Sequence, residues 1–143
     1  LLQKHMLVRY AFLADTVTLD AGGKINAIGI FENVFAQNFP SVHRDMCLVA
    51  NLEGSINERG EHKISVEFRD SDSNKLASID QNIVLGNPKI THGTLRAGVV
   101  IKLQDLLFPR AGQYEFVVFG NDRFLSRVTF MVNQIQIKEA GEA

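Results

Sequence analysis

The amino-acid sequence predicts an all-β protein, folded as an antiparallel β-sandwich of about eight strands. Three observations predict this class. Apolar residues alternate with polar ones in most segments of the chain, which is the period of a half-buried strand. Polar turns containing glycine, asparagine and aspartate separate these segments at short intervals. No window has the apolar spacing of an amphipathic helix of ordinary length.

The clearest strand is 63–70, where Ile64, Val66 and Phe68 alternate with polar residues. Segments 8–19 and 24–35 flank a glycine-containing turn, so they are expected to form a β-hairpin. Residues 103–107 are expected to make one helical turn before Pro109. The expected strands are 8–19, 24–35, 46–52, 63–70, 75–85, 95–103, 113–119 and 125–132. Periodicity does not encode strand order, so an immunoglobulin-like and a jelly-roll-like Greek key both fit.

The segment from Leu106 to Tyr114 resembles the crossing before a late strand of immunoglobulin-like sandwiches. In that crossing a tyrosine hydroxyl bonds back to the backbone, which is called a tyrosine corner. The alternative is that Tyr114 is one more aromatic side chain that faces the core.

Composition bounds the organisation and the function. The chain has 143 residues with 15 basic and 16 acidic side chains and a net charge of −1, so we expect one domain that binds neither nucleic acid nor an anionic membrane. Residues 6–137 are the expected domain, 1–5 an added remnant or an upstream extension, and 138–143 a frayed tail. No apolar run approaches the roughly 20 residues that span a bilayer. The single cysteine and the lack of an Asn-x-Ser/Thr site fit a cytoplasmic protein.

The first hairpin is apolar on both faces, which predicts a homo-oligomer. Along 24–35 one face carries Ile25, Ala27, Phe31 and Phe35, and the other carries Ile28, Ile30 and Val34. A strand of this kind must be covered on both sides. We therefore expect Ile28, Ile30 and Val34 to contact another subunit, unless residues 37–44 fold over that face.

The sequence offers little for catalysis, so we expect a protein that is not an enzyme. The four histidines lie in four segments, and no two have metal-ligand spacing. Folding could still bring Asp15, His43 and His62 into one polar pocket. Cys47 lies within an apolar segment, which is typical of an inert core thiol.

One turn has the pattern of a cation site. Asp70, Asp72 and Asn74 alternate along a short polar segment, and calcium prefers several oxygen ligands. The glycine and the distant glutamate of an EF-hand are absent. The sequence leaves two interpretations: a calcium- or small-ligand-binding loop, or a polar β-turn between two strands.

Several segments together resemble a known family. They are Arg9–Asp15 (RYAFLAD), residues 23–31 (GKINAIGIF), Phe39-Pro40 with His43, Gly60-Glu61-His62 and the segment from Phe108 to Tyr114. This pattern, which covers nearly all of 6–132, resembles a family of small bacterial proteins of unknown function. The resemblance implies a bacterial, cytoplasmic β-sandwich without an assigned activity. With the residues above, it leads us to expect a binding or assembly module that self-associates through its first hairpin.

Overall fold

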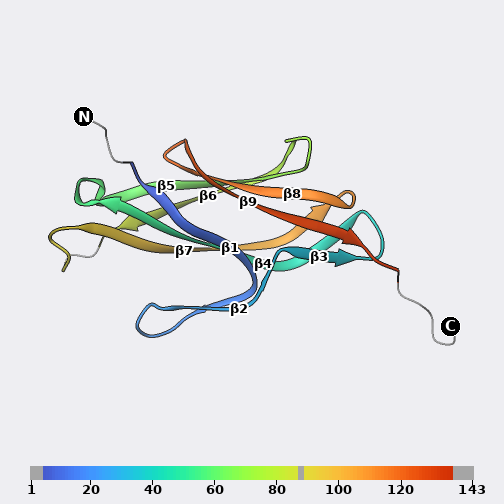
Figure 1. Ribbon diagram of the computed structural model, residues 1–143, viewed down its shortest axis with the longest axis horizontal. Coiled ribbons are helices and arrows are strands. Elements are labelled where there is room, and N and C mark those ends of the chain that lie inside the picture. The colour runs from blue at the N-terminus through green and yellow to red at the C-terminus, as the bar shows by residue number, and fades with distance from the viewer. Residues whose placement is uncertain (1–4, 87–88, 137–143) are drawn as a thin grey trace.

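Two packed β-sheets form the protein in the computed structural model, which describes residues 5–86 and 89–136 (Figure 1). The first sheet has the order β2-β1-β4-β7 and the second has the order β3-β9-β8-β5-β6. The strands are β1 (Leu7–Leu19), β2 (Ile25–Phe31), β3 (Asn33–Ala36), β4 (Ser41–Ser55), β5 (Gly60–Arg69), β6 (Lys75–Leu85), β7 (Thr94–Phe108), β8 (Gly112–Gly120) and β9 (Arg123–Gln134). A short 3₁₀ helix, η1 (Ile56–Glu58), precedes β5. The predicted all-β sandwich is confirmed.

Nine strands replace the expected eight because the segment 24–35 divides between the two sheets. β2 pairs antiparallel with β1, so that Ala14 lies opposite Ile30. After Glu32 the chain crosses to the second sheet, where β3 pairs in parallel with β9 and Val34 lies opposite Val132. One continuous apolar segment therefore belongs to two layers.

The strand order is that of an immunoglobulin-like sandwich. β9-β8-β5-β6 correspond to the strands called G, F, C and C′, and β4 and β7 lie side by side as B and E do. The immunoglobulin-like alternative therefore describes the topology, with the hairpin of β1 and β2 extending the first sheet.

The core lies between the sheets and is rich in aromatic rings. Phe68 is its centre: its ring centroid lies 5.5 Å from that of Tyr114, 5.2 Å from Phe116 and 5.8 Å from Phe108. All four rings are at most 3% exposed. Aromatic pairs at these separations add attraction to the burial of apolar area.

A second, smaller apolar cluster lies on the outer face of the first sheet. Ala14, Val17, Cys47 and Val49 are buried there, and Ile25 from β2 packs against them. Ile25 also lies so close to Gly98 that a Cβ at residue 98 would be 2.7 Å from its Cδ1 atom. The hairpin therefore folds beneath β4 and β7, on the side away from the second sheet (Figure 1). Cys47 is a buried free thiol, as the sequence predicts.

One local prediction was wrong, and one alternative that the sequence left open does not hold. Residues 103–107 are not helical, because β7 continues through them to Phe108. Leu103 and Leu106 both face the core because Asp105 between them has a φ of 53°. Residues 37–44 do not cover the hairpin, since β4 already begins at Ser41 and Phe39 packs against the main core.

Candidate functional site

The acidic turn between β5 and β6 is organised by the carboxylate of Asp70. Its Oδ1 atom accepts hydrogen bonds from the backbone N–H of Asp72 and of Asn74, both at 2.9 Å. Its Oδ2 atom accepts a bond of 3.2 Å from the Asn74 side chain. Asp70 is the one buried charged residue of the described chain, at 6% exposed. The turn therefore supplies the donors that a buried carboxylate requires.

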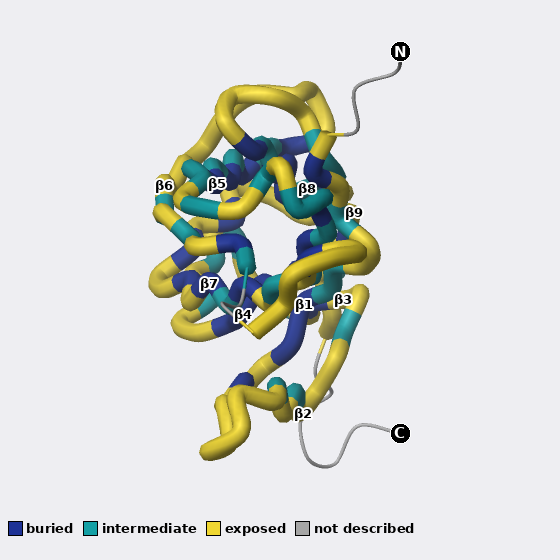
Figure 2. Tube along the Cα trace, turned by 90° about the vertical axis from the view of Figure 1, so that its left-hand side faces the viewer, coloured by how far each residue is buried: buried dark blue, intermediate teal, exposed yellow. Residues whose placement is uncertain are grey.

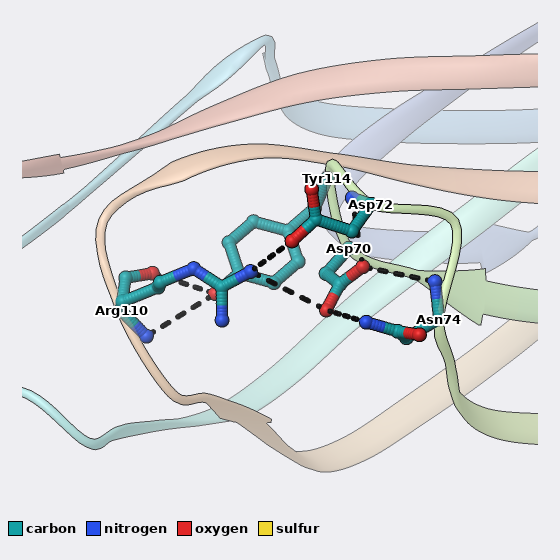
Figure 3. A network of polar contacts seen from close by, with 5 residues as sticks. All are labelled: Asp70, Asp72, Asn74, Arg110 and Tyr114. Atoms are coloured by element: carbon teal, nitrogen blue, oxygen red, sulfur yellow. Dashed lines mark hydrogen bonds and ion pairs between the residues drawn. The ribbon is translucent and has the colours of Figure 1, made fainter.

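Arg110 connects this turn to the loop between β7 and β8 (Figure 3). Its Nη2 atom lies 3.1 Å from Oδ2 of Asp72 and 3.5 Å from Oδ2 of Asp70. The backbone of the same residue holds Tyr114, whose hydroxyl donates a 2.6 Å bond to the Arg110 carbonyl and accepts one of 3.3 Å from the Arg110 N–H. The tyrosine corner is confirmed.

Asp70 titrates below the usual range of an aspartate. Burial would by itself raise its pKa, but hydrogen bonds from Asn74 and from the Asp72 backbone, with the charge of Arg110, lower the pKa below 3.8. A carboxyl group with a lowered pKa in the folded state stabilises the fold above its unfolded pKa of about 3.9, and this contribution is lost as pH falls through the folded pKa.

We therefore expect the melting temperature of Asp70→Asn to lie below that of the wild type at neutral pH. The difference shrinks as the pH falls from about 4 through the lowered folded pKa, because the wild-type carboxyl group then becomes neutral as well. Thermal melts of both proteins between about pH 3 and pH 7 measure this. A difference that stays constant over that range contradicts the assignment.

The same contacts do not favour the expected calcium site. The oxygens of Asp70 are occupied by protein donors, and Arg110 provides the positive charge that a cation would bring. Among the described residues, no group of three or more histidine, cysteine, aspartate or glutamate side chains could hold a metal ion. The polar β-turn is the interpretation that this geometry supports.

Calcium is accordingly expected to leave the melting temperature unchanged within about 1 °C. A site filled at about 100 times its Kd would stabilise the protein by about 2.7 kcal/mol, which a melt detects readily. A rise in melting temperature with millimolar calcium in the wild type, absent in Asp70→Asn, would restore the calcium interpretation.

The structure does not bring the expected polar pocket together. His43 lies near the start of β4, where its ring is 6.4 Å from that of Phe31 and 6.3 Å from that of Phe108. His62 lies beyond the other end of β4 and binds the Glu58 carbonyl at 2.6 Å and the Asn121 side chain at 2.8 Å. The expectation of one pocket was wrong because His43 lies near the start of β4 and His62 lies in β5 beyond its end, so most of the length of this 15-residue strand separates them.

Asp15, the third residue of that set, is exposed and lies over Gly29. A Cβ at residue 29 would be 2.4 Å from its Oδ2 atom, and Gly29 has a φ of 72°. The Asp15 side chain therefore approaches the backbone of β2 closely at this glycine, and the positive φ of Gly29 interrupts the regular geometry of the strand.

The three residues expected at a subunit interface are separated as well. Ile28 and Ile30 are 65% and 61% exposed, whereas Val34 is 7% exposed and belongs to the core. Val34 is therefore no part of an exposed surface. After β2 the chain crosses to the second sheet, and this places the Val34 side chain in the core between the sheets. Figure 2 shows the hairpin as an exposed projection from the sandwich, and Leu19 at its end is also 63% exposed.

The edge strands of the two sheets differ in charge. β6 carries Lys75 and Asp80, and β7 carries Arg96, Lys102 and Asp105. β3 has no charge but only four residues. β2 has seven residues and no charged side chain. Exposed edges are normally kept from pairing by charges or by short length, so β2 is the least protected edge of the described chain.

The comparisons with known proteins concern the family and the fold. A family of unknown function (DUF6941) matches residues 9–133. The chain belongs to this family. The predicted resemblance is thereby confirmed, and no curated protein matches the chain. Within residues 5–86 and 89–136, no helix is long and apolar enough to cross a membrane.

Two solved structures are similar to this member of the family. One is the alkylpurine DNA glycosylase AlkC of Pseudomonas fluorescens, with a TM-score of 0.52 and 8% identity. That match covers 92% of this chain but only 31% of the glycosylase chain. The other is an immunoglobulin-like protein from Pseudomonas aeruginosa, with a TM-score of 0.46, 14% identity, and 90% and 97% of the two chains covered. The likeness to the glycosylase shows the fold alone.

The sequence-based predictions did not include two residues of these sites. Arg110 was not identified as the partner of Asp70, although a lone arginine next to Pro109 in the expected corner is a usable signal. Leu19 was not identified as exposed, although it lies beside the turn of the hairpin, where few neighbours can cover a side chain.

Proposed function

We propose that this protein is a non-enzymatic binding and assembly module that self-associates through its first hairpin. The contact consists of Ile28 and Ile30 on β2, and the partner is a second copy of the same chain. One observation carries the proposal: β2 is an uncharged edge strand with two largely exposed isoleucines.

The lack of charge on β2 favours a second copy of the same chain as its binding partner. In a two-fold dimer the same surface meets itself, so each charged side chain near the axis meets its own copy. An uncharged strand avoids this repulsion, whereas the edges at β6 and β7 carry charges. Because Gly29 interrupts the regular strand, we assign the contact to the isoleucine side chains rather than to an unbroken backbone ladder.

The polar side chains that could take part in catalysis instead hold turns and loops in place, which supports a role without catalysis. Asp70 holds a turn, His62 holds the loops around η1 and the turn after β8, and the thiol of Cys47 is buried. The single buried cysteine also supports our proposal that the protein works in the reducing cytoplasm.

Cysteine cross-linking tests the contact. Ile28→Cys and Ile30→Cys place a thiol on the proposed surface, and Val84→Cys places one on β6, where Val84 is 69% exposed. The wild type serves as the blank because its only cysteine is buried. Under mild oxidation we expect a covalent dimer from at least one hairpin variant and none from Val84→Cys. Equal cross-linking of the hairpin variants and Val84→Cys, or none in any variant, would contradict the proposal.

A further inference from the structure

The first hairpin divides into a base that belongs to the first sheet and a tip that does not. β1 pairs with β4 only as far as Ala14, which lies opposite Cys47. β1 goes on pairing with β2 as far as Leu19, which lies opposite Ile25. In the described part of the chain, the backbone of residues 16–28 therefore pairs only within itself, and we call this segment the arm (Figure 2).

A bend joins the arm to the rest of the hairpin. In β2 the bend lies at Gly29, whose φ is 72°, and the Asp15 side chain of β1 lies directly against this glycine. β1 changes face at the same place. Ala14 and Val17 are buried in the same outer cluster, although residues three positions apart point to opposite faces of a regular strand. Because glycine accepts changes of φ and ψ at the lowest cost, Asp15 and Gly29 form a hinge.

The arm packs on the outer face of the first sheet through a small apolar contact. Val17, Ile25 and Ala27 supply this contact from the arm, and Val49 lies among its partners on the sheet. The closest fit is between Ile25 and Gly98 of β7, where a Cβ atom at residue 98 would lie 2.7 Å from Cδ1 of Ile25. None of these residues belongs to the main core. The arm can therefore leave its own sheet without opening the core.

We propose that two copies of the chain exchange their arms, so that the arm of each copy packs on the outer face of the other copy's first sheet. The inference rests on the proposed self-association and specifies its geometry. Because the two copies have the same sequence, Val17, Ile25 and Ala27 make the same contacts on the second copy, and such an exchange is a low-cost route to a dimer. Ile28 and Ile30 flank the hinge glycine, so the exchange brings these exposed side chains together where the two chains cross.

Two substitutions of matched size test the exchange. Ile25→Ala removes side-chain volume from the arm, and Gly98→Val adds the same number of carbon atoms to the sheet beneath it. Each variant alone has an arm that does not match its own sheet. In an exchanged heterodimer, the Ile25→Ala arm packs on the Gly98→Val sheet, and the unchanged arm packs on the unchanged sheet. After the two variants are refolded together from urea, native mass spectrometry should show heterodimers exceeding both homodimers combined by about tenfold.

The chain that carries both substitutions gives the reverse test, which also serves if a single substitution prevents folding. Its arm and sheet match, so it should fold and dimerise as the wild type does. Refolded with ¹⁵N-labelled wild type, it should form heterodimers about tenfold below the homodimers combined, because each exchanged heterodimer contains two mismatched contacts. Heterodimers equal to the homodimers combined in both mixtures would show self-association without exchange and overturn the inference. Monomers alone in the wild type would overturn the inference and the proposed function together.

Discussion

Replacing Ile28 by aspartate is expected to convert the self-associated protein into monomers. The side chain is 65% exposed in the single chain, so the substitution does not disturb the core. At a two-fold contact the change occurs twice, and each isoleucine buried there contributes about 1.5–3 kcal/mol. The dimer Kd should therefore rise by about 100-fold or more. Sedimentation velocity over a range of concentrations measures this change.

Val84→Asp is the matched control for this prediction. Val84 is an equally exposed aliphatic side chain, at 69%, but it lies on the edge strand of the other sheet. Its replacement should leave the dimer Kd unchanged. If Ile28→Asp instead unfolds the protein, as thermal melts would show, the face is internal and the account of the hairpin is wrong.

Tyr114→Phe is expected to lower the free energy of unfolding by about 0.5–1.5 kcal/mol, because the partly buried hydrogen bonds between the hydroxyl group and the Arg110 backbone are lost. The ring remains in the aromatic cluster, so the loss reports on the hydroxyl group alone. The hydroxyl group accepts a hydrogen bond from the Arg110 N–H and donates one to the Arg110 carbonyl. Arg110 also forms an ion pair with the acidic turn. Urea unfolding followed by circular dichroism measures this quantity.

Tyr10→Phe is the comparison for this substitution, since Tyr10 is the other tyrosine of the chain. Its ring stacks on Phe12 and its side chain is 48% exposed. Surface changes of this kind stay within about 0.5 kcal/mol. Equal effects of the two substitutions would show that the corner contributes nothing specific to stability.

The strands and the tyrosine corner could be predicted because both depend on local patterns. Alternation along β5 identifies Ile64, Val66 and Phe68 as inward residues, and all three are at most 3% exposed. Tyr114 bonds to a residue only four positions before it, so its partner lies within the segment that carries the signal.

Long-range pairing could not be predicted in the same way. Arg110 and Asp70 are 40 residues apart, and only the packing of two loops brings them together. Val34 shares its alternation with Ile28 and Ile30, but the chain changes sheets at Glu32, and parity along the sequence loses its meaning there. The exposure of Ile28 and Ile30 was expected, and the burial of Val34 follows from its pairing with β9.

A native mass spectrum of the wild-type protein at several concentrations tests the central claim most directly. Our account predicts a dimer of twice the chain mass, with a share that rises with concentration and falls in Ile28→Asp. A monomer at every concentration up to about 100 µM, well above the Kd of a dimer with micromolar affinity, would contradict self-association through the first hairpin.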